Sequence, residues 1–212
     1  ESVAAGLIPN LGDRYFVVDP LDGTKEFIKR NGEFTVNIAL VEKGYPVLGV
    51  VLVPVTGDVF AGDETGAFVW RSGEQPPDRR KLNVSPASPL RIVASRSHGH
   101  AAIQELCRRL PVEADVSVGS SLKFCQLARG DASLYPRLTP TCEWDTAAGQ
   151  AVLEAAGGVV MTLEDQRLSY GKNTQSFLNP FFVAASTAAL AASATTELRS
   201  ILQSDQSRAT AS

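Results

Sequence analysis

The feature that most constrains this chain is the segment 19–24, with the sequence DPLDGT, which directly follows the apolar run YFVV at residues 15–18. A short run of aromatic and β-branched residues predicts a buried strand. We therefore expect Asp19 and Asp22 where a strand ends and a turn begins, which is where α/β sheets place ligand sites. Pro20 has a fixed φ and sets the direction in which the chain leaves the strand.

Two carboxylates three positions apart repel each other unless a cation lies between them. Mg²⁺ takes oxygen ligands from carboxylates, backbone carbonyls and phosphates, so Asp19, Asp22 and the carbonyl of Leu21 form a candidate ligand set. The N–H groups of Gly23 and Thr24 can point at a phosphate. A plain polar turn is the alternative, because Asp, Pro and Gly are common turn residues. For the whole segment after a buried strand we favour a metal–phosphate site.

Composition excludes several other classes of protein. The chain has 212 residues and a net charge of −3, which gives no electrostatic reason to bind nucleic acid. It has three cysteines without a CxxC pair, which argues against a disulfide framework or a zinc site and favours a reducing cytosol. No stretch is long and apolar enough to cross a bilayer, so we expect no transmembrane segment.

The pattern along the chain changes near its middle. Residues 14–70 predict an antiparallel meander in which the alternating segment 33–40 is a strand with one buried side. The Pro-, Gly- and Ser-rich stretch 71–90 is the best candidate for a linker. Strands and helices then alternate, which predicts an α/β second half. The expected strands are 91–94, 116–118, 132–135, 159–162 and 181–185, and the expected helices are 98–110, 120–129 and 146–156. We therefore divide the chain into an antiparallel half at 1–85, an α/β half at 86–186, and a disordered or frayed helical tail at 187–212.

Several polar residues lie at predicted strand ends and helix starts. Asp145 opens a predicted helix, where it can act as an N-cap, as a metal ligand or as both. Ser120 and His98 stand at helix starts, which suit anions. Lys123 offers a point charge, and Arg137 a guanidinium suited to bidentate phosphate contact. Alone, His98 and Ser120 are more typical of helix caps, Lys123 of a solvated face and Arg137 of a surface ion pair. Together these four residues predict a second phosphate site.

Two separated motifs carry a family resemblance. Residues 19–27, DPLDGTKEF, and residues 144–149, WDTAAG, resemble the two signatures of the Mg²⁺-dependent, lithium-sensitive phosphatases that include inositol monophosphatase. The KEF ending is similar to the 3'(2'),5'-bisphosphate nucleotidase branch of the bacterial CysQ type, whereas inositol monophosphatases more often have Thr-Asn-Phe there. The resemblance covers residues 1–185. It implies an α/β (α+β) fold, namely the layered αβαβα sandwich of the inositol monophosphatase/fructose-1,6-bisphosphatase type.

The resemblance also implies an activity. Such enzymes remove the 3'-phosphate of adenosine 3',5'-bisphosphate (PAP) to give AMP, and the sulfated analogue PAPS is a further candidate substrate that would give APS. Water attacks directly, without a phospho-enzyme, in a site holding two or three Mg²⁺ ions. The matching metal ligands are Asp19, Leu21 through its carbonyl, Asp22 and Asp145. Thr24 would help to orient the water, Gly23 and Leu21 would contact the substrate, and His98, Ser120, Lys123 and Arg137 would bind the second phosphate and the nucleoside.

The family has a helical N-terminal segment before this point, which we expect to be missing from this chain. It ends in Ser-Glu-Glu, whose first Glu is a metal ligand, and Glu1 matches the second Glu better. One ligand and the upstream Asp that orients the water are therefore expected to be absent. We expect a nucleotide substrate, a monomer or homodimer, and a cytoplasmic location, with peripheral attachment to the inner membrane as an alternative.

Three other interpretations stay open from the sequence. An inositol-monophosphatase-like enzyme would use the same fold. A haloacid-dehalogenase-type phosphatase needs D-x-D-G-T, and here the spacing is one residue longer. An inactive, truncated chain that binds nucleotide or metal is the interpretation from a different functional class.

Overall fold

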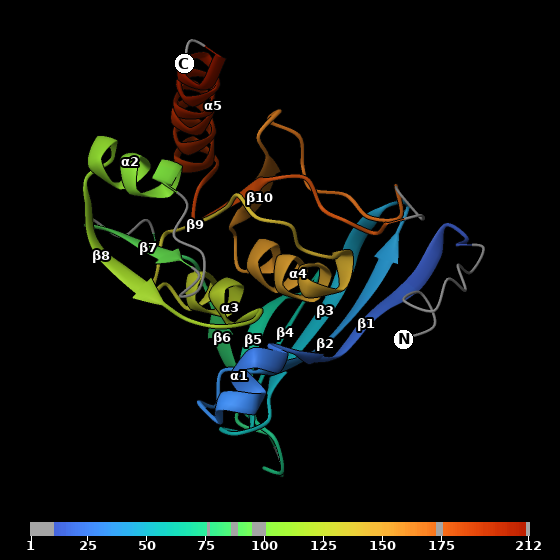
Figure 1. Cartoon of the computed structure of the whole chain (residues 1–212). Coiled ribbons are helices and arrows are strands. Elements are labelled where there is room, and N and C mark those ends of the chain that lie inside the picture. The colour runs from blue at the N-terminus through green and yellow to red at the C-terminus, as the bar shows by residue number, and fades with distance from the viewer. Residues whose placement is uncertain (1–10, 76, 86–88, 95–100, 173–175, 211–212) are drawn as a thin grey trace.

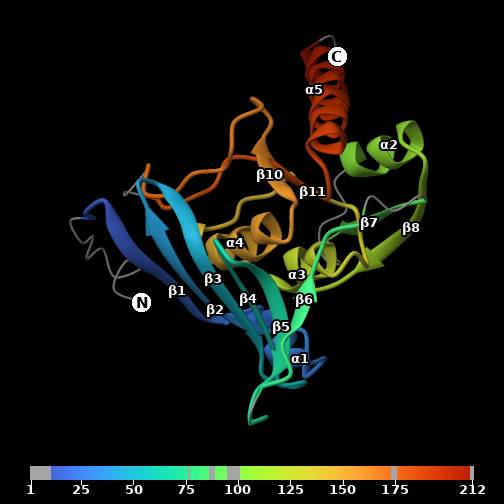
Figure 2. The same ribbon diagram turned by 180° about the vertical axis from the view of Figure 1, so that it is seen from behind.

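The computed structural model describes residues 11–75, 77–85, 89–94, 101–172 and 176–210. Its first half is a six-stranded antiparallel sheet in which each strand pairs with the next one along the chain. This confirms the predicted meander and adds one strand from the expected linker (Figure 2). The strands are β1 (Arg14–Asp22), β2 (Thr35–Glu42), β3 (Tyr45–Val53), β4 (Asp58–Asp63), β5 (Gly66–Arg71) and β6 (Arg80–Leu82).

The second half is built on a mixed five-stranded sheet with the order β10-β11-β9-β7-β8. Strand β7 runs parallel to β8 and β9, whereas β11 is antiparallel to both β9 and β10. The strands are β7 (Leu90–Ala94), β8 (Val112–Ser117), β9 (Leu134–Arg137), β10 (Val159–Thr162) and β11 (Phe182–Ala185). The expected α/β second half is therefore present, with strand and helix ends that differ from the predicted ones by up to four residues.

Helices separate and cover the two sheets. Helices α3 (Leu122–Ala128) and α4 (Ala147–Ala155) lie between them, whereas α2 (Ala101–Arg109) and α5 (Ala188–Thr210) pack together on the far side of the second sheet (Figure 1). The short helix α1 (Thr24–Lys29) follows β1, and the 3-10 turn η1 (Glu143–Asp145) precedes α4. This alternation of sheets and helices is the layered α/β architecture that the sequence predicted.

The tail is a helix rather than a disordered segment. Helix α5 buries Ala191, Ala194, Leu198 and Ile201 against the second sheet and α2. Of the two alternatives that the sequence left open for the tail, the structure has the helical one over Ala188–Thr210. No helix in the described part of the chain combines the length and the apolar character needed to span a membrane.

The first two strands of the first sheet, β1 and β2, do not bury the residues that their hydrophobic pattern indicates. Strand β1 was predicted to be buried, but it is an edge strand, and Phe16 and Val18 are 67% and 49% exposed. In β2 the buried side carries Thr35 and Asn37, whereas Ile38 on the opposite side is 38% exposed. The reason is that η1 and α4 cover only one face of this sheet. That inner face carries the polar residues of β2, which surround the acidic site described below.

Candidate metal and phosphate site

Asp19 and Asp22 lie on the same face of β1 because the strand contains a bulge between them. Asp19 pairs with Asn37 and Asp22 with Thr35, so three steps along β1 match two steps along β2. Without the extra residue, side chains three positions apart would point to opposite faces. The strand end predicted at Asp19 is therefore three residues too early: β1 continues to Asp22, which is its last residue, and the irregularity inside the strand brings the two carboxylates together.

Asp145 reaches the same place from the second half of the chain. It is the last residue of η1, and its Oδ2 accepts a hydrogen bond from the backbone N–H of Cys142 at 2.8 Å. Of the roles that the sequence left open for Asp145, the N-cap of the following helix is not found, because α4 begins at Ala147 with Thr146 as its N-cap residue. The extra turn of η1 places the carboxylate ahead of the helix and directs it toward β1.

The three carboxylates form a cluster that can hold a cation. One oxygen each from Asp19, Asp22 and Asp145 lies within 4.8 Å of the others. Burial, reinforced by the negative charge of Asp22, raises the pKa of Asp145 to about 7. Burial also raises the pKa of Asp19, although a 2.9 Å hydrogen bond from Leu21 N–H opposes this shift. Such a cluster resists full ionisation when it is empty and becomes favourable around a hard cation, so the donor set fits Mg²⁺.

Three further residues hold Asp22 in place. Its Oδ2 accepts hydrogen bonds from Ser121 N at 2.6 Å, Ser121 Oγ at 2.7 Å, Asn37 Nδ2 at 3.2 Å and Thr35 Oγ1 at 3.3 Å. The sequence analysis assigned none of these residues to the site. The signal that could have found Thr35 and Asn37 is their regular spacing in β2, which places both side chains on the face that Asp19 and Asp22 share.

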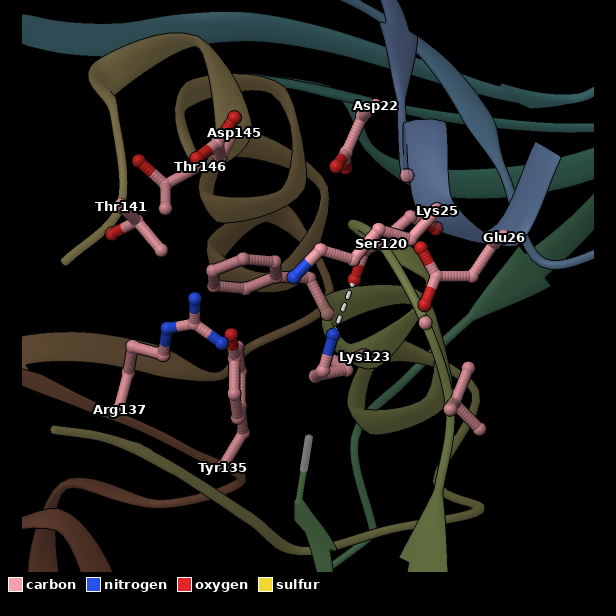
Figure 3. Close-up of a pocket in the computed structure, with 14 residues that line it drawn as sticks. Asp22, Lys25, Glu26, Ser120, Lys123, Tyr135, Arg137, Thr141, Asp145 and Thr146 are labelled. Carbon is pink, nitrogen blue, oxygen red and sulfur yellow. Dashed lines mark hydrogen bonds between the residues drawn. The ribbon is translucent and has the colours of Figure 1, made fainter. Parts of the chain in front are cut away.

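A pocket of about 160 Å³ lies beside the cluster (Figure 3). Lys123 and Arg137 stand across the pocket from Asp22 and Asp145 in this view. Its lining also includes Gly23, Lys25, Glu26, Gly119, Ser120, Tyr135, Thr141 and Thr146. The pocket therefore has an acidic end and a basic end, which is the charge distribution needed to hold metal ions at one side and a second anionic group at the other.

The basic end is built from buried or anchored side chains. Lys123 is only 4% exposed, its Nζ donates to the Ser120 carbonyl at 2.9 Å, and burial lowers its pKa to about 8. Arg137 donates to the carbonyls of Thr139 and Pro140 at 3.2 and 3.3 Å, which fixes its guanidinium at the pocket wall. Lys123 is therefore not the solvated surface charge that the sequence left open as an alternative, and Arg137, for which the alternative was a surface ion pair, is held by two backbone carbonyls.

The remaining predicted site residues differ in whether they line the pocket. Gly23 and Ser120 line the pocket, both with a left-handed backbone, at φ 89° and 49°. Thr24 is exposed at the first position of α1 and does not line the pocket, and neither does Leu21. His98 and Glu1 lie outside the described residues. Lys25 and Glu26, which follow Thr24 in α1, also line the pocket.

Comparison with known families identifies the chain at this point. The model of the inositol monophosphatase family matches residues 5–206. The chain belongs to the inositol monophosphatase family. The resemblance carried by DPLDGTKEF and WDTAAG is thus confirmed at the family level, and the interpretation as a haloacid-dehalogenase-type phosphatase is set aside.

Individual relatives agree with the family. The chain is 51% identical over 169 residues to the 3'(2'),5'-bisphosphate nucleotidase CysQ of Escherichia coli K12, covering 80% of this chain and 67% of that protein. The crystal structure of CysQ from Bacteroides thetaiotaomicron superposes with a TM-score of 0.74 at 42% identity, over 82% of this chain and 70% of that one. The inositol monophosphatase from Anabaena superposes with a TM-score of 0.70 at 24% identity, over 92% and 74% of the two chains, and shows the shared fold.

Proposed function

We propose that this protein is a Mg²⁺-dependent phosphomonoesterase that removes the 3'-phosphate of PAP and releases AMP and phosphate. The observation that carries the proposal is the pairing of an acidic cluster, Asp19, Asp22 and Asp145, with a pocket whose far side holds Lys123 and Arg137. The relatives named as 3'(2'),5'-bisphosphate nucleotidases support the same choice of substrate. PAPS, which also carries a 3'-phosphate, is a second substrate under this proposal.

The acidic end would hold two or three Mg²⁺ ions through the carboxylates of Asp19, Asp22 and Asp145 and the carbonyl of Leu21. When bound, Mg²⁺ supplies Lewis-acid stabilisation of the phosphoryl oxygens and lowers the pKa of the attacking water. The protein's own part is to hold the three carboxylates close together and in register, a role that the bulge in β1 and the turn η1 support. Thr24 helps to orient the water, and Gly23 contacts the scissile phosphate.

The basic end would bind the other phosphate of a bisphosphate. Arg137 provides a planar donor array for an anion, and Lys123 provides a compact charge beside it. Ser120 lies in the same wall and bonds to Lys123 through its carbonyl, and His98 is included in this set by the sequence. An inositol monophosphate has no second phosphate, so in an inositol phosphatase the buried Lys123 and the half-buried Arg137 would have no anionic ligand to bind. This is why a bisphosphate nucleotide is the favoured substrate.

The test is phosphate release from PAP, inositol 1-phosphate and AMP, measured side by side with Mg²⁺ and with excess chelator. We expect PAP to be hydrolysed at least ten times faster than the other two, only with metal, and Asp145→Asn to abolish the reaction. Faster turnover of inositol 1-phosphate would favour the inositol-monophosphatase-like alternative. Metal-dependent AMP binding without phosphate release would favour the inactive, truncated chain. The cytoplasmic location and the monomeric or homodimeric state belong to the same proposal.

A further inference from the structure

The carboxylate of Asp22 is held from one side only. All four of its side-chain contacts with described donors go to Oδ2, and no described residue donates to Oδ1. An oxygen that accepts this many hydrogen bonds cannot turn away from them without leaving buried donors unpaired. The Asp22 carboxylate is thereby held in one orientation beside Asp19 and Asp145, with which it can share a cation.

Ser121 connects two of the three acidic residues. Its Oγ lies 2.7 Å from Asp22 Oδ2 and 2.8 Å from the backbone carbonyl oxygen of Asp145, and it accepts a hydrogen bond from Asn37 Nδ2 at 2.8 Å. Ser121 and Asn37 are each 1% exposed. The contacts of Ser121 Oγ therefore join β2, the end of β1, η1 and the start of α3. They lie in the protein interior, shielded from water.

A role limited to helix capping does not explain this arrangement. Ser121 is the N-cap residue of α3, where a serine hydroxyl normally accepts from the helix's own N–H groups. Here the side chain makes no capping bond to α3. The hydroxyl is turned instead toward Asp22 and Asp145, and the backbone N–H of Ser121 points at Asp22 as well.

We propose that Ser121, supported by Asn37, is a positioning residue that fixes Asp22 relative to Asp145 and thereby sets the affinity of the cluster for divalent cations. The inference rests on the proposed function, because it assumes that the three carboxylates bind metal. Residues that hold metal ligands in place affect metal affinity by about 10-fold to 100-fold. Thr35, whose contact with Asp22 is longer at 3.3 Å, contributes less.

The experiment measures metal binding directly, without substrate. Free Mn²⁺ is counted by electron paramagnetic resonance during titration of wild type, Ser121→Ala and Asn37→Ala. Ser186→Ala is the matched control, because Ser186 is equally buried and its hydroxyl has no partner in the described structure. We expect the Mn²⁺ dissociation constant to rise about tenfold or more in the first two variants, and to stay unchanged in the control.

A kinetic readout separates positioning from general damage to the fold. In Ser121→Ala the Mg²⁺ concentration needed for half-maximal activity should rise by the same factor, while KM for the nucleotide at saturating Mg²⁺ stays within about twofold. Wild-type Mn²⁺ affinity in both Ser121→Ala and Asn37→Ala would overturn the inference and leave the proposed function intact. No Mn²⁺ binding by wild type would overturn both. Thr35→Val should bind Mn²⁺ with an affinity between those of wild type and Ser121→Ala, and a larger loss than in Ser121→Ala would contradict the assignment.

Discussion

Ala148 in α4 packs directly on Gly49 in β3: a Cβ placed on Gly49 would lie 2.3 Å from the carbonyl oxygen of Ala148. Gly62 in β4 makes a similar approach, 2.7 Å from the Cα of Val152. These two glycines let the helix lie closer to the sheet than side chains would allow. Because η1 leads directly into α4, this packing also determines how far Asp145 lies from β1.

Gly49→Ala should therefore reduce both stability and activity. The added methyl group would push α4 away, because the nearest atoms are the backbone carbonyl of Ala148 and the Cβ of Ala151, which cannot rotate aside. Overpacking of this kind costs about 1–3 kcal/mol, which urea unfolding would measure. No atom of the described residues lies within 4 Å of a Cβ placed on Gly12, so Gly12→Ala is the control and should leave the free energy of unfolding nearly unchanged. Equal stability of the two variants would contradict the close packing.

The charge of Asp145 should destabilise the metal-free fold. Burial raises its pKa from 3.8 to about 7, so the carboxyl group favours folding below pH 4 and loses that contribution as pH rises through 7. Asp145→Asn keeps an oxygen that can accept from Cys142 N–H but removes the charge. In excess chelator we expect the variant to melt several degrees higher than wild type at pH 8, and at the same temperature near pH 4.

Added Mg²⁺ should reverse this order. Wild type gains stability from bound metal by mass action, whereas Asp145→Asn has lost one ligand and should gain much less. Differential scanning calorimetry of both proteins, with excess chelator and with saturating Mg²⁺, compares their melting temperatures. If Asp145→Asn were less stable than wild type at pH 8 without metal, the buried charge of Asp145 would not destabilise the metal-free fold.

The sequence predicted the acidic cluster correctly for a chemical reason. Asp19, Asp22 and Asp145 lie in two motifs whose residue types are useful together only around a cation, and the structure brings them together. The predicted roles of Thr24 and the Leu21 carbonyl stay predictions, because they depend on ligands bound at the site. The bulge between Asp19 and Asp22 was not foreseen, since periodicity assumes a regular strand.

What the sequence could not give is which face of a strand is covered. Periodicity separates the two sides of β2 but does not say which side α4 will cover. The pattern therefore favours burial of the apolar side and gives Asn37 no role in the site. The contact of Ser121 with Asp22 joins positions 99 residues apart. No local pattern encodes such a pair, because it arises only when α3 packs against the first sheet.

Lys123 should impose an alkaline limit on activity. Burial lowers its pKa to about 8, so the ammonium is charged below that pH and neutral above it. An anionic substrate binds the charged form, and kcat/KM reports ionisation of the free enzyme. We expect kcat/KM for PAP to fall as pH rises through 8. Lys123→Met should have a lower kcat/KM at pH 7 and should lack this fall, whereas Lys29→Met, which changes an exposed residue outside the pocket, should keep it.

Arg137 should distinguish a bisphosphate from a monophosphate. If its guanidinium binds the phosphate that is not cleaved, Arg137→Gln removes a charge-assisted contact worth about 1.5–3 kcal/mol, or about 10-fold to 100-fold in affinity. KM for PAP should rise by that factor, while KM for 3'-AMP, which lacks the 5'-phosphate, should change little. Arg129→Gln is the control, because Arg129 pairs with Asp131 away from the pocket. An equal rise for both substrates would mean that Arg137 contacts the scissile phosphate or only supports the fold, and the basic end of the pocket would then not explain the preference for a second phosphate.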